Sequence, residues 1–315
     1  MTRDLVLALS GGIGGAKLAL GLSHILPPEN LLIVANTGDD FEHFSLSISP
    51  DIDTLTYTLA DLDNQVFGWG RRDETWSFME TLEKLGGETW FRLGDRDLAL
   101  HTERTRRLRA GETLSAITAD IAARLGIGPL ILPMSDDLVR TRVRTDEGWI
   151  DFQHYFVREQ CRPVVRELAF IGAETARPQP DFLAALKNPR LRAVVICPSN
   201  PFISVEPILA LPGVRAALAA CTAPVVAVSP IIGGKAVKGP TAKMFLELGT
   251  TPSAAAVAER YGDLLDGYII DHEDAAAAAS IAVPTHATRT LMTSLDDRIS
   301  LAATTLAFAD TLAPT

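Results

Sequence analysis

The chain has 315 residues, of which 47% are hydrophobic, and its net charge is −10 at pH 7. This length and composition indicate a folded protein with a large core and argue against a disordered chain. The acidic balance argues against a general nucleic-acid binder, which needs a basic surface, but it permits a local positive pocket for a nucleotide.

The first predicted element is a buried strand at residues 4–10, which runs into a glycine-rich turn at 11–17 and an apolar helix at 18–25. Glycines let the backbone approach a ligand closely, and a helix N-terminus attracts anions. The turn departs from a Walker loop because Leu18 replaces the Ser/Thr, and from a dinucleotide fingerprint because Lys17 replaces the last glycine. We predict a phosphate site here, with a ligand-free turn as the alternative. Its candidate binding residues are Gly11, Gly12, Gly14, Gly15 and Lys17.

Further short apolar runs follow, and each ends in polar or turn-forming residues. They lie at residues 31–35, 129–132, 193–196, 225–228 and 268–270. Because helix-like stretches rich in Ala and Leu separate them, the pattern predicts an α/β fold with a Rossmann-like, mostly parallel sheet and helices on both faces. The carboxyl ends of parallel strands share one edge, where ligands bind in such folds, so the polar endings predict the rim of one active site.

The chain is expected to form a single domain over residues 1–315, in which a regular core alternates with a smaller inserted α/β region. The core is expected at roughly 1–60, 110–137 and 190–315, and the inserted region at roughly 61–110 and 138–190. Within the inserted region, alternating residues around Glu147-Gly148 predict a hairpin turn.

Aspartates occur in pairs after the predicted strands. The pairs are Asp39-Asp40, Asp51 with Asp53, Asp95 with Asp97, and Asp136-Asp137. Carboxylate oxygens suit Mg²⁺, which usually takes one or two of them and completes its shell with water and phosphate oxygens. Any single pair is more typical of a helix cap or a turn. Four pairs beside a phosphate turn predict a Mg²⁺ site that uses one or two of these carboxylates.

Other polar and aromatic segments are candidates for ligand contact. Ser199-Asn200 lies between two prolines and predicts either phosphate or ribose contact or a rigid N-cap. A second Gly/Lys loop at 233–240 could bind phosphate or be simply flexible. Trp69 and Trp76 lie in an Arg-rich stretch that could stack on an aromatic ligand or pack in the core. His101 follows Asp97 and is expected near the site.

Taken together, these segments resemble the 2-phospho-L-lactate transferase (CofD-like) family, in the family's order and to about residue 274. The matching segments are residues 11–17, 36–40, 49–54, 68–70, 93–99, 133–137, 152–153, 198–201 and 229–234. The resemblance implies a role in making the deazaflavin coenzyme F-420. Enzymes of this family join a guanylylated three-carbon phosphoacid to the terminal ribityl hydroxyl of the deazaflavin Fo, and GMP leaves. It also implies dependence on Mg²⁺ and a homodimer.

The resemblance and the residue chemistry together imply roles for matching positions. The expected metal ligands are Asp39, Asp40 and Asp53. The expected catalytic residues are Asp40, Asp53 and Arg96: a carboxylate orients or deprotonates the attacking hydroxyl, and Arg96 or Lys17 stabilises phosphoryl charge. Besides the glycine turn, substrate contacts are expected from Asn36, Asp97, Ser135, Asp136, Ser199, Asn200 and Gly234. On this interpretation, Asp53→Asn nearly abolishes turnover without unfolding the protein.

The sequence leaves the donor and one alternative function open. Phospholactate, phosphoenolpyruvate and 3-phosphoglycerate differ by a few atoms, and residues 42–44 and 61–63, expected near the Fo pocket, do not decide between them. A related group of nucleotide-sugar-binding regulators shares the glycine turn and an Asp-Asp motif, but the segments 49–54, 94–97 and 133–137 fit the transferases better. A nicotinamide oxidoreductase is disfavoured because Asn36 stands where an acidic residue is expected.

Cysteine usage and hydropathy bear on the compartment. Cys161, Cys197 and Cys221 are widely spaced and form no CxxC motif, which argues against a disulfide framework or a zinc site. The N-terminus has no signal-peptide pattern, and no apolar run reaches the length of a membrane span. We therefore expect a cytoplasmic protein whose partners are its small-molecule substrates, with neither nucleic acid nor membrane involved.

Overall fold

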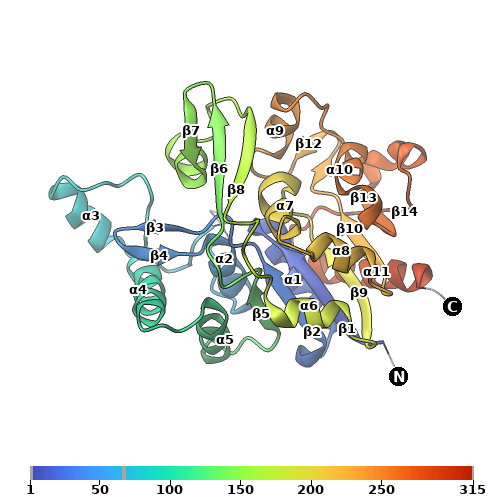
Figure 1. Cartoon of the computed structure of the whole chain (residues 1–315), viewed down its shortest axis with the longest axis horizontal. Helices are drawn as coiled ribbons and strands as arrows, with labels where there is room; N and C mark the ends of the chain where they lie inside the picture. The colour runs from blue at the N-terminus through green and yellow to red at the C-terminus, as the bar shows by residue number, and fades with distance from the viewer. Residues whose placement is uncertain (1–2, 66–68, 314–315) are drawn as a thin grey trace.

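Figure 1 shows the computed structural model, which describes residues 3–65 and 69–313, as a parallel sheet flanked by helices. Gly68 of the Gly68-Trp69-Gly70 segment lies outside the described residues. In the described chain the main sheet has seven strands, and every neighbouring pair is parallel. In sheet order they are β14 (Thr285–Thr288), β13 (Gly267–Asp271), β10 (Val225–Val228), β9 (Leu191–Ile196), β1 (Leu5–Ser10), β2 (Leu31–Ala35) and β5 (Leu130–Pro133). The predicted α/β class is confirmed.

The central strand β1 explains why the sheet is covered on both faces. Its residues Val6, Leu7, Ala8 and Leu9 are all fully buried. Successive side chains of a strand point to opposite faces, so Leu7 and Leu9 join one hydrophobic cluster while Val6 and Ala8 join another. A continuous apolar run of this kind is stable only when helices shield both faces from water.

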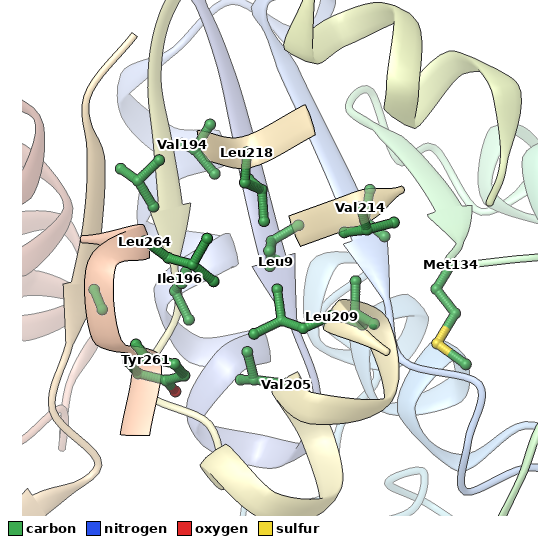
Figure 2. Close-up of a cluster of buried hydrophobic side chains, with 14 of the residues drawn as sticks. Leu9, Met134, Val194, Ile196, Val205, Leu209, Val214, Leu218, Tyr261 and Leu264 are labelled. Atoms are coloured by element: carbon green, nitrogen blue, oxygen red, sulfur yellow. The ribbon is translucent and has the colours of Figure 1, made fainter. Parts of the chain in front are cut away.

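Each hydrophobic cluster is completed by its own set of helices. On one face lie α1 (Gly12–Ile25), α2 (Pro50–Leu59), α5 (Leu114–Arg124) and α11 (Leu295–Leu312). On the other lie α6 (Pro180–Leu186), α7 (Glu206–Leu209), α8 (Val214–Ala219), α9 (Thr241–Glu247) and α10 (Ala254–Tyr261). Figure 2 shows side chains of the second face, where Leu209, Val214 and Leu218 lie over strand residues such as Leu9 and Val194.

Helix α1 begins earlier than the sequence predicts. The expected apolar helix starts at Leu18, whereas the observed helix starts at Gly12, with Gly11 in an extended conformation as its N-cap. The glycine-rich turn is therefore the first part of the helix. Glycine lowers helix propensity, so propensity alone did not predict this start, which tertiary contacts stabilise.

The remaining elements form smaller units around the sheet. They include two short antiparallel hairpins, β3 (Phe41–His43) with β4 (Leu46–Ile48) and β11 (Ile231–Ile232) with β12 (Lys235–Ala236), and the three-stranded sheet of β6 (Arg140–Thr145), β7 (Gly148–Asp151) and β8 (Glu167–Ile171). The helices are α3 (Ser77–Lys84) and α4 (Asp95–Arg109), with the short helical turns η1 (Pro28–Asn30), η2 (His154–Arg158), η3 (Pro201–Val205), η4 (Gly262–Leu264) and η5 (His272–Ser280). The predicted hairpin turn is confirmed, because Thr145 pairs with Gly148 across β6 and β7.

Strand register brings three distant loops together at one edge of the sheet. Ser10 pairs with Ala35, and Leu9 pairs with Ile196, so the loops that begin at Gly11, Asn36 and Cys197 start side by side. The β3–β4 hairpin and the three-stranded sheet extend beyond this edge (Figure 1). Within the described residues, no helix is both long and apolar enough to cross a membrane.

Candidate active site

A cavity of about 620 Å³ lies where these loops meet. Its walls come from the start of α1, an acidic floor supplied by the loop after β2 and by α2, and aromatic side chains from the added units. Of the residues assigned a catalytic, substrate-binding or metal-binding role from the sequence, those that line it are Gly11, Gly12, Gly14, Lys17, Asp39, Asp53, Asp97, Ser199 and Asn200. The fold therefore gathers most of the predicted site around one space.

The start of α1 is held by the chain's own side chains. The Gly12 N–H donates to Asp51 Oδ1 at 2.7 Å, and the Gly11 N–H donates to Ser199 Oγ at 3.2 Å. The Ser199 hydroxyl in turn donates to the Gly11 carbonyl oxygen at 2.8 Å. A carboxylate at a helix N-terminus is stabilised by the helix dipole. Two N–H groups that the sequence assigned to a phosphate are thus already bonded within the protein.

The glycines of this turn serve different purposes. A Cβ on Gly14 would overlap the carbonyl oxygen of Pro198, and one on Gly15 would lie 2.7 Å from Ser199 Oγ and still closer to Ser10. These two glycines therefore permit close packing of α1 against the neighbouring turn. Gly12 has a φ of +63° with open space around it, so it is needed for backbone conformation.

Asn36 lies outside the cavity lining and acts on the site through Asp51. Its side-chain N–H groups donate to Asp51 Oδ2 at 2.9 Å and to the Ile203 carbonyl oxygen at 3.1 Å, while its Oδ1 accepts the Gly38 N–H at 2.8 Å. All of its side-chain polar atoms are thereby engaged. Asn36 orients Asp51, which then holds the start of α1.

The acidic floor contains carboxyl groups that lack full partners. Asp39 lines the cavity, whereas Asp40 lies outside the lining and accepts a hydrogen bond from Ser49 Oγ at 2.8 Å. The Oδ1 atoms of both are buried without a hydrogen-bond partner among the described residues. Burial raises the pKa of Asp40 to about 7 and that of Asp51 to about 6, and burial together with the Asp51 charge raises the pKa of Asp39 well above its ordinary value.

Asp53 belongs to a buried network that joins α2 to α4. Both of its oxygens accept from the Arg104 guanidinium, with Oδ2 3.1 Å from Nη1. His101 lies between two carboxylates, with Nδ1 3.7 Å from Asp53 Oδ2 and Nε2 3.1 Å from Asp97 Oδ2. The Tyr57 hydroxyl also donates to Asp97. The network fixes Asp53 and Asp97 where both line the cavity.

Sequence reasoning missed Arg104 and Tyr57, although one signal was available. Asp97, His101 and Arg104 recur at intervals of four and three residues, which places them on one face of α4. Arg104 is only 2% exposed, and a buried arginine requires an anionic partner. His101, expected near the site, is confirmed as a cavity-lining residue.

To bind Mg²⁺, a carboxylate oxygen of the acidic floor must be free of protein partners. In the described part of the chain, no group of three or more His, Cys, Asp or Glu side chains is arranged to hold a metal ion. Mg²⁺ needs only one or two protein carboxylates, and Asp39 offers a buried, unpartnered oxygen beside the cavity. Asp53 fits less well because Arg104 already engages both of its oxygens. The Mg²⁺ site stays a prediction, with Asp39 as its best-fitting ligand.

Aromatic side chains also line the cavity and form an aromatic wall. They are Trp69, Trp90, Phe91, Phe152 and Phe156. The Phe152 and Phe156 rings stack with their centroids 5.3 Å apart, and Trp90 lies 4.7 Å from the His154 ring. Trp69 is half exposed at the rim, whereas Trp76 packs under the Arg92 guanidinium at 4.2 Å. This wall suits a planar apolar ligand.

Several predicted site residues lie outside the cavity lining. Asp136 accepts from the Ser115 N–H and hydroxyl, both at 2.7 Å, and so holds the start of α5. Ser135 donates to the Arg177 carbonyl oxygen at 2.7 Å, and the Arg96 backbone N–H donates to Glu74 at 2.8 Å. Gly234 forms the turn between β11 and β12 with a φ of +73°. The structure thus gives these residues local roles in turns and helix starts.

Asp40→Asn is expected to change how stability depends on pH. A folded-state pKa of about 7 means that the folded protein keeps this proton when the unfolded chain has lost it, so rising pH opposes folding. Between about pH 4 and pH 7, the wild type should lose on the order of 4 kcal/mol of unfolding free energy relative to the variant. Urea denaturation of both proteins across this range measures the difference. Parallel profiles would show that Asp40 is ionised throughout.

Known proteins are similar to this chain along nearly its whole length. A model of the family described as 2-phospho-L-lactate transferase CofD matches residues 6–299. A phosphoenolpyruvate transferase from Kitasatospora aureofaciens is 41% identical over 315 residues, covering 97% of this chain and 98% of that protein. One from Thermobifida fusca is 42% identical over 284 residues, covering 86% of this chain and 87% of that protein.

A solved structure shares the fold. The crystal structure of a UPF0052 family protein from Bacillus halodurans superposes with a TM-score of 0.64 and covers 97% of this chain and 99% of that one. Its sequence identity is 14%, so the likeness supports the architecture alone.

Proposed function

The chain belongs to the CofD family of transferases, and from this membership and the geometry of the cavity we propose that it forms the phosphodiester of a deazaflavin coenzyme of the F-420 type. In the proposed reaction, the terminal ribityl hydroxyl of Fo attacks the phosphorus of a guanylylated three-carbon phosphoacid. A new P–O bond forms, the P–O bond to GMP breaks, and GMP leaves. The observation that carries the proposal is one cavity lined together by the start of α1, by buried carboxylates and by aromatic side chains.

Phosphoenolpyruvate is the proposed acid of the donor. The similar proteins from Kitasatospora aureofaciens and Thermobifida fusca are both named phosphoenolpyruvate transferase, at 41% and 42% identity. Their similarity extends over most of the chain. The description of the family model refers to phospholactate instead. We therefore favour a guanylylated phosphoenolpyruvate over the phospholactate and 3-phosphoglycerate donors.

The aromatic wall is the proposed place for the deazaflavin ring of the acceptor. Planar rings gain free energy by stacking on or packing edge-on against aromatic side chains. Phe91 and Trp90 approach one face of the cavity, and Phe152 and Phe156 contribute from the segment after β7. A ring held there would direct its ribityl chain towards the acidic floor and the start of α1.

The acidic floor is the proposed place of the chemistry. Asp39 would hold Mg²⁺, with Asp40 and Asp53 beside it, and the ion would neutralise charge on the phosphate oxygens. Asp53 and Asp97 both line the cavity, so either carboxylate can orient the attacking hydroxyl or accept its proton. Lys17 lines the cavity and can offset phosphoryl charge, a role for which Arg96 is less well placed.

A donor assay tests the proposal. The protein is incubated with Fo, Mg²⁺ and each of the three guanylylated acids in turn, and the mass of the deazaflavin product is recorded together with release of GMP. We expect a product with the phosphoenolpyruvate donor, formed faster than with either other acid. Absence of a product with every donor would contradict transferase activity on Fo and favour the nucleotide-sugar-binding alternative.

Two further expectations accompany the proposal. The homodimer implied by the family resemblance is tested by sedimentation of the purified protein. A cytoplasmic location is tested by fractionation of the source cells. Neither property is needed for the chemistry proposed above, because every residue invoked there belongs to one chain.

A further inference from the structure

Two lysine side chains line the cavity, and a buried arginine, Arg298, lies on the helix that packs against α1. The lysines are Lys17 on α1 and Lys238 in the loop between β12 and α9. Arg298 lies on α11, whose backbone packs so closely on α1 that a Cβ on Gly21 would overlap the Arg298 carbonyl oxygen. Burial lowers the pKa of Lys17, and the positive charges of Arg298 and Lys238 lower it further. Lys17 and Lys238 therefore share the cavity, and Arg298 adds positive potential at Lys17.

In the part of the chain that the structure describes, no carboxylate is in direct contact with these cations. The Lys17 ammonium donates to the neutral carbonyl oxygen of Met292 at 2.9 Å. Arg298 is only 7% exposed, and its Nε has no hydrogen-bond partner among the described residues. Within residues 3–65 and 69–313, none of the three forms a salt bridge. Buried cations are costly unless an anion compensates them.

Asp63 faces this group, because the Arg298 charge opposes the rise of the Asp63 pKa on burial, but it forms no salt bridge with the three cations in the described residues. Asp63 and Asp297 raise the pKa of Lys17 less than the two cations lower it. Asp297 already accepts hydrogen bonds from the Thr293 and Ser294 N–H groups, each at 2.9 Å, at the start of α11. Two carboxylates beside three cations leave a net positive charge, which an external anion can compensate.

Elsewhere in the lining, Arg92 is also cationic, but its guanidinium lies over the Trp76 ring, 4.2 Å from the ring centroid. Asp51 and Ser199 already engage the N–H groups of Gly12 and Gly11, so these two donors are not open to a ligand. A ligand with carboxylate or phosphate groups must therefore place at least one of them against side-chain cations.

We propose that Lys17, Lys238 and Arg298 form an oxyanion subsite that binds a carboxylate or phosphate group of the ligand. That this ligand is a guanylylated phosphoacid rests on the proposed function, whereas the existence of the subsite does not. The two lysines contact the anion from the cavity wall, and Arg298 adds positive charge beside Lys17.

Calorimetric titration tests the subsite without any catalytic step. Phosphoenolpyruvate, GMP and pyrophosphate are titrated into the wild-type protein and into Lys238→Gln, whose side chain is exposed and whose loss should not affect folding. Lys235→Gln is the matched control, because Lys235 is an exposed lysine three residues earlier, in β12 and outside the cavity lining. A lost charge-assisted hydrogen bond should weaken binding about tenfold in Lys238→Gln. Lys235→Gln should bind like the wild type.

The three probes identify the bound group. Weaker binding of phosphoenolpyruvate and pyrophosphate, with GMP unchanged, places the transferred acid and its phosphate in the subsite. Weaker binding of GMP as well places the nucleotide phosphate there. Unchanged binding of all three probes in Lys238→Gln, or an equal loss in Lys235→Gln, would overturn the proposal.

Arg298 is tested with a variant that keeps its charge. Arg298→Lys should retain anion binding within about threefold, whereas Arg298→Gln should lose about tenfold. Urea denaturation of both variants shows whether the buried position has been disturbed. A folded Arg298→Gln that binds all three probes like the wild type would remove Arg298 from the subsite. Because these readouts are binding constants, they stand even if no transfer to Fo is detected.

Discussion

Asp53→Asn is expected to lower turnover of Fo about a thousandfold, because Asp53 lines the acidic floor where we place the reacting phosphate. Asparagine keeps the shape of the side chain but removes the charge that could bind Mg²⁺ or accept a proton. Product formation from Fo and the guanylylated donor, under single-turnover conditions, measures the loss. Wild-type turnover in this variant would remove Asp53 from the chemistry.

The structure adds a cost in stability that the sequence did not predict. Arg104 is buried against both oxygens of Asp53, so the variant leaves an uncompensated charge in the interior. Breaking a buried ion pair on one side typically costs about 3 kcal/mol or more. We therefore still expect the variant to fold, but with a lower free energy of unfolding, which urea denaturation measures.

A double variant separates the two effects. Asp53→Asn combined with Arg104→Gln removes both charges and should recover most of the lost stability while turnover stays low. Asp136→Asn is the matched control, because Asp136 holds the start of α5 and lies outside the cavity lining. That control should keep wild-type turnover and lose about 1 kcal/mol of unfolding free energy.

Gly14→Ala is expected to damage both stability and activity. A Cβ there would overlap the carbonyl oxygen of Pro198, a backbone atom, so α1 must move away from the turn that carries Ser199. Overpacking of this kind costs about 3 kcal/mol, which exceeds the gain of about 1 kcal/mol in helix propensity. Because α1 begins at the cavity, its displacement should also lower turnover about a hundredfold.

A substitution in the same helix provides the comparison. Ser23→Ala loses a hydrogen bond to the Leu20 carbonyl oxygen within α1 but gains helix propensity, so it should be close to neutral in both assays. Urea denaturation and the transfer assay are applied to both variants. If Gly14→Ala were as stable and active as Ser23→Ala, the close packing of α1 on the Pro198 turn would be of no consequence.

Local patterns in the sequence were sufficient for the sheet and for part of the site. Continuous apolar runs such as 31–35 and 193–196 can be satisfied only by strands buried on both faces, and this is how they fold. Since such strands are parallel, their carboxyl ends meet at one edge, which brought the glycine turn, Asp39 and Ser199 to a single cavity. These predictions needed no knowledge of long-range contacts.

Residue type alone could not separate the aspartates of the site from those that hold helix starts. Asp136 and Asp39 both follow a strand in an Asp-Asp pair. Only the folded chain shows that Asp136 accepts hydrogen bonds from Ser115, whereas Asp39 keeps an unpartnered oxygen beside the cavity. The difference lies in which helix each loop meets, and that is decided by packing.

The sequence by itself determined the α/β sheet, the edge at which the ligand loops gather and the family resemblance, because each follows from short runs of neighbouring residues. The tertiary structure alone decided that Asp51 occupies the start of α1, that Arg104 pairs with Asp53, and that Lys17 and Lys238 line the same cavity. These contacts join residues far apart in the chain. Each depends on a charged or polar group that the fold brings to a partner. A local sequence pattern does not show which groups will be buried.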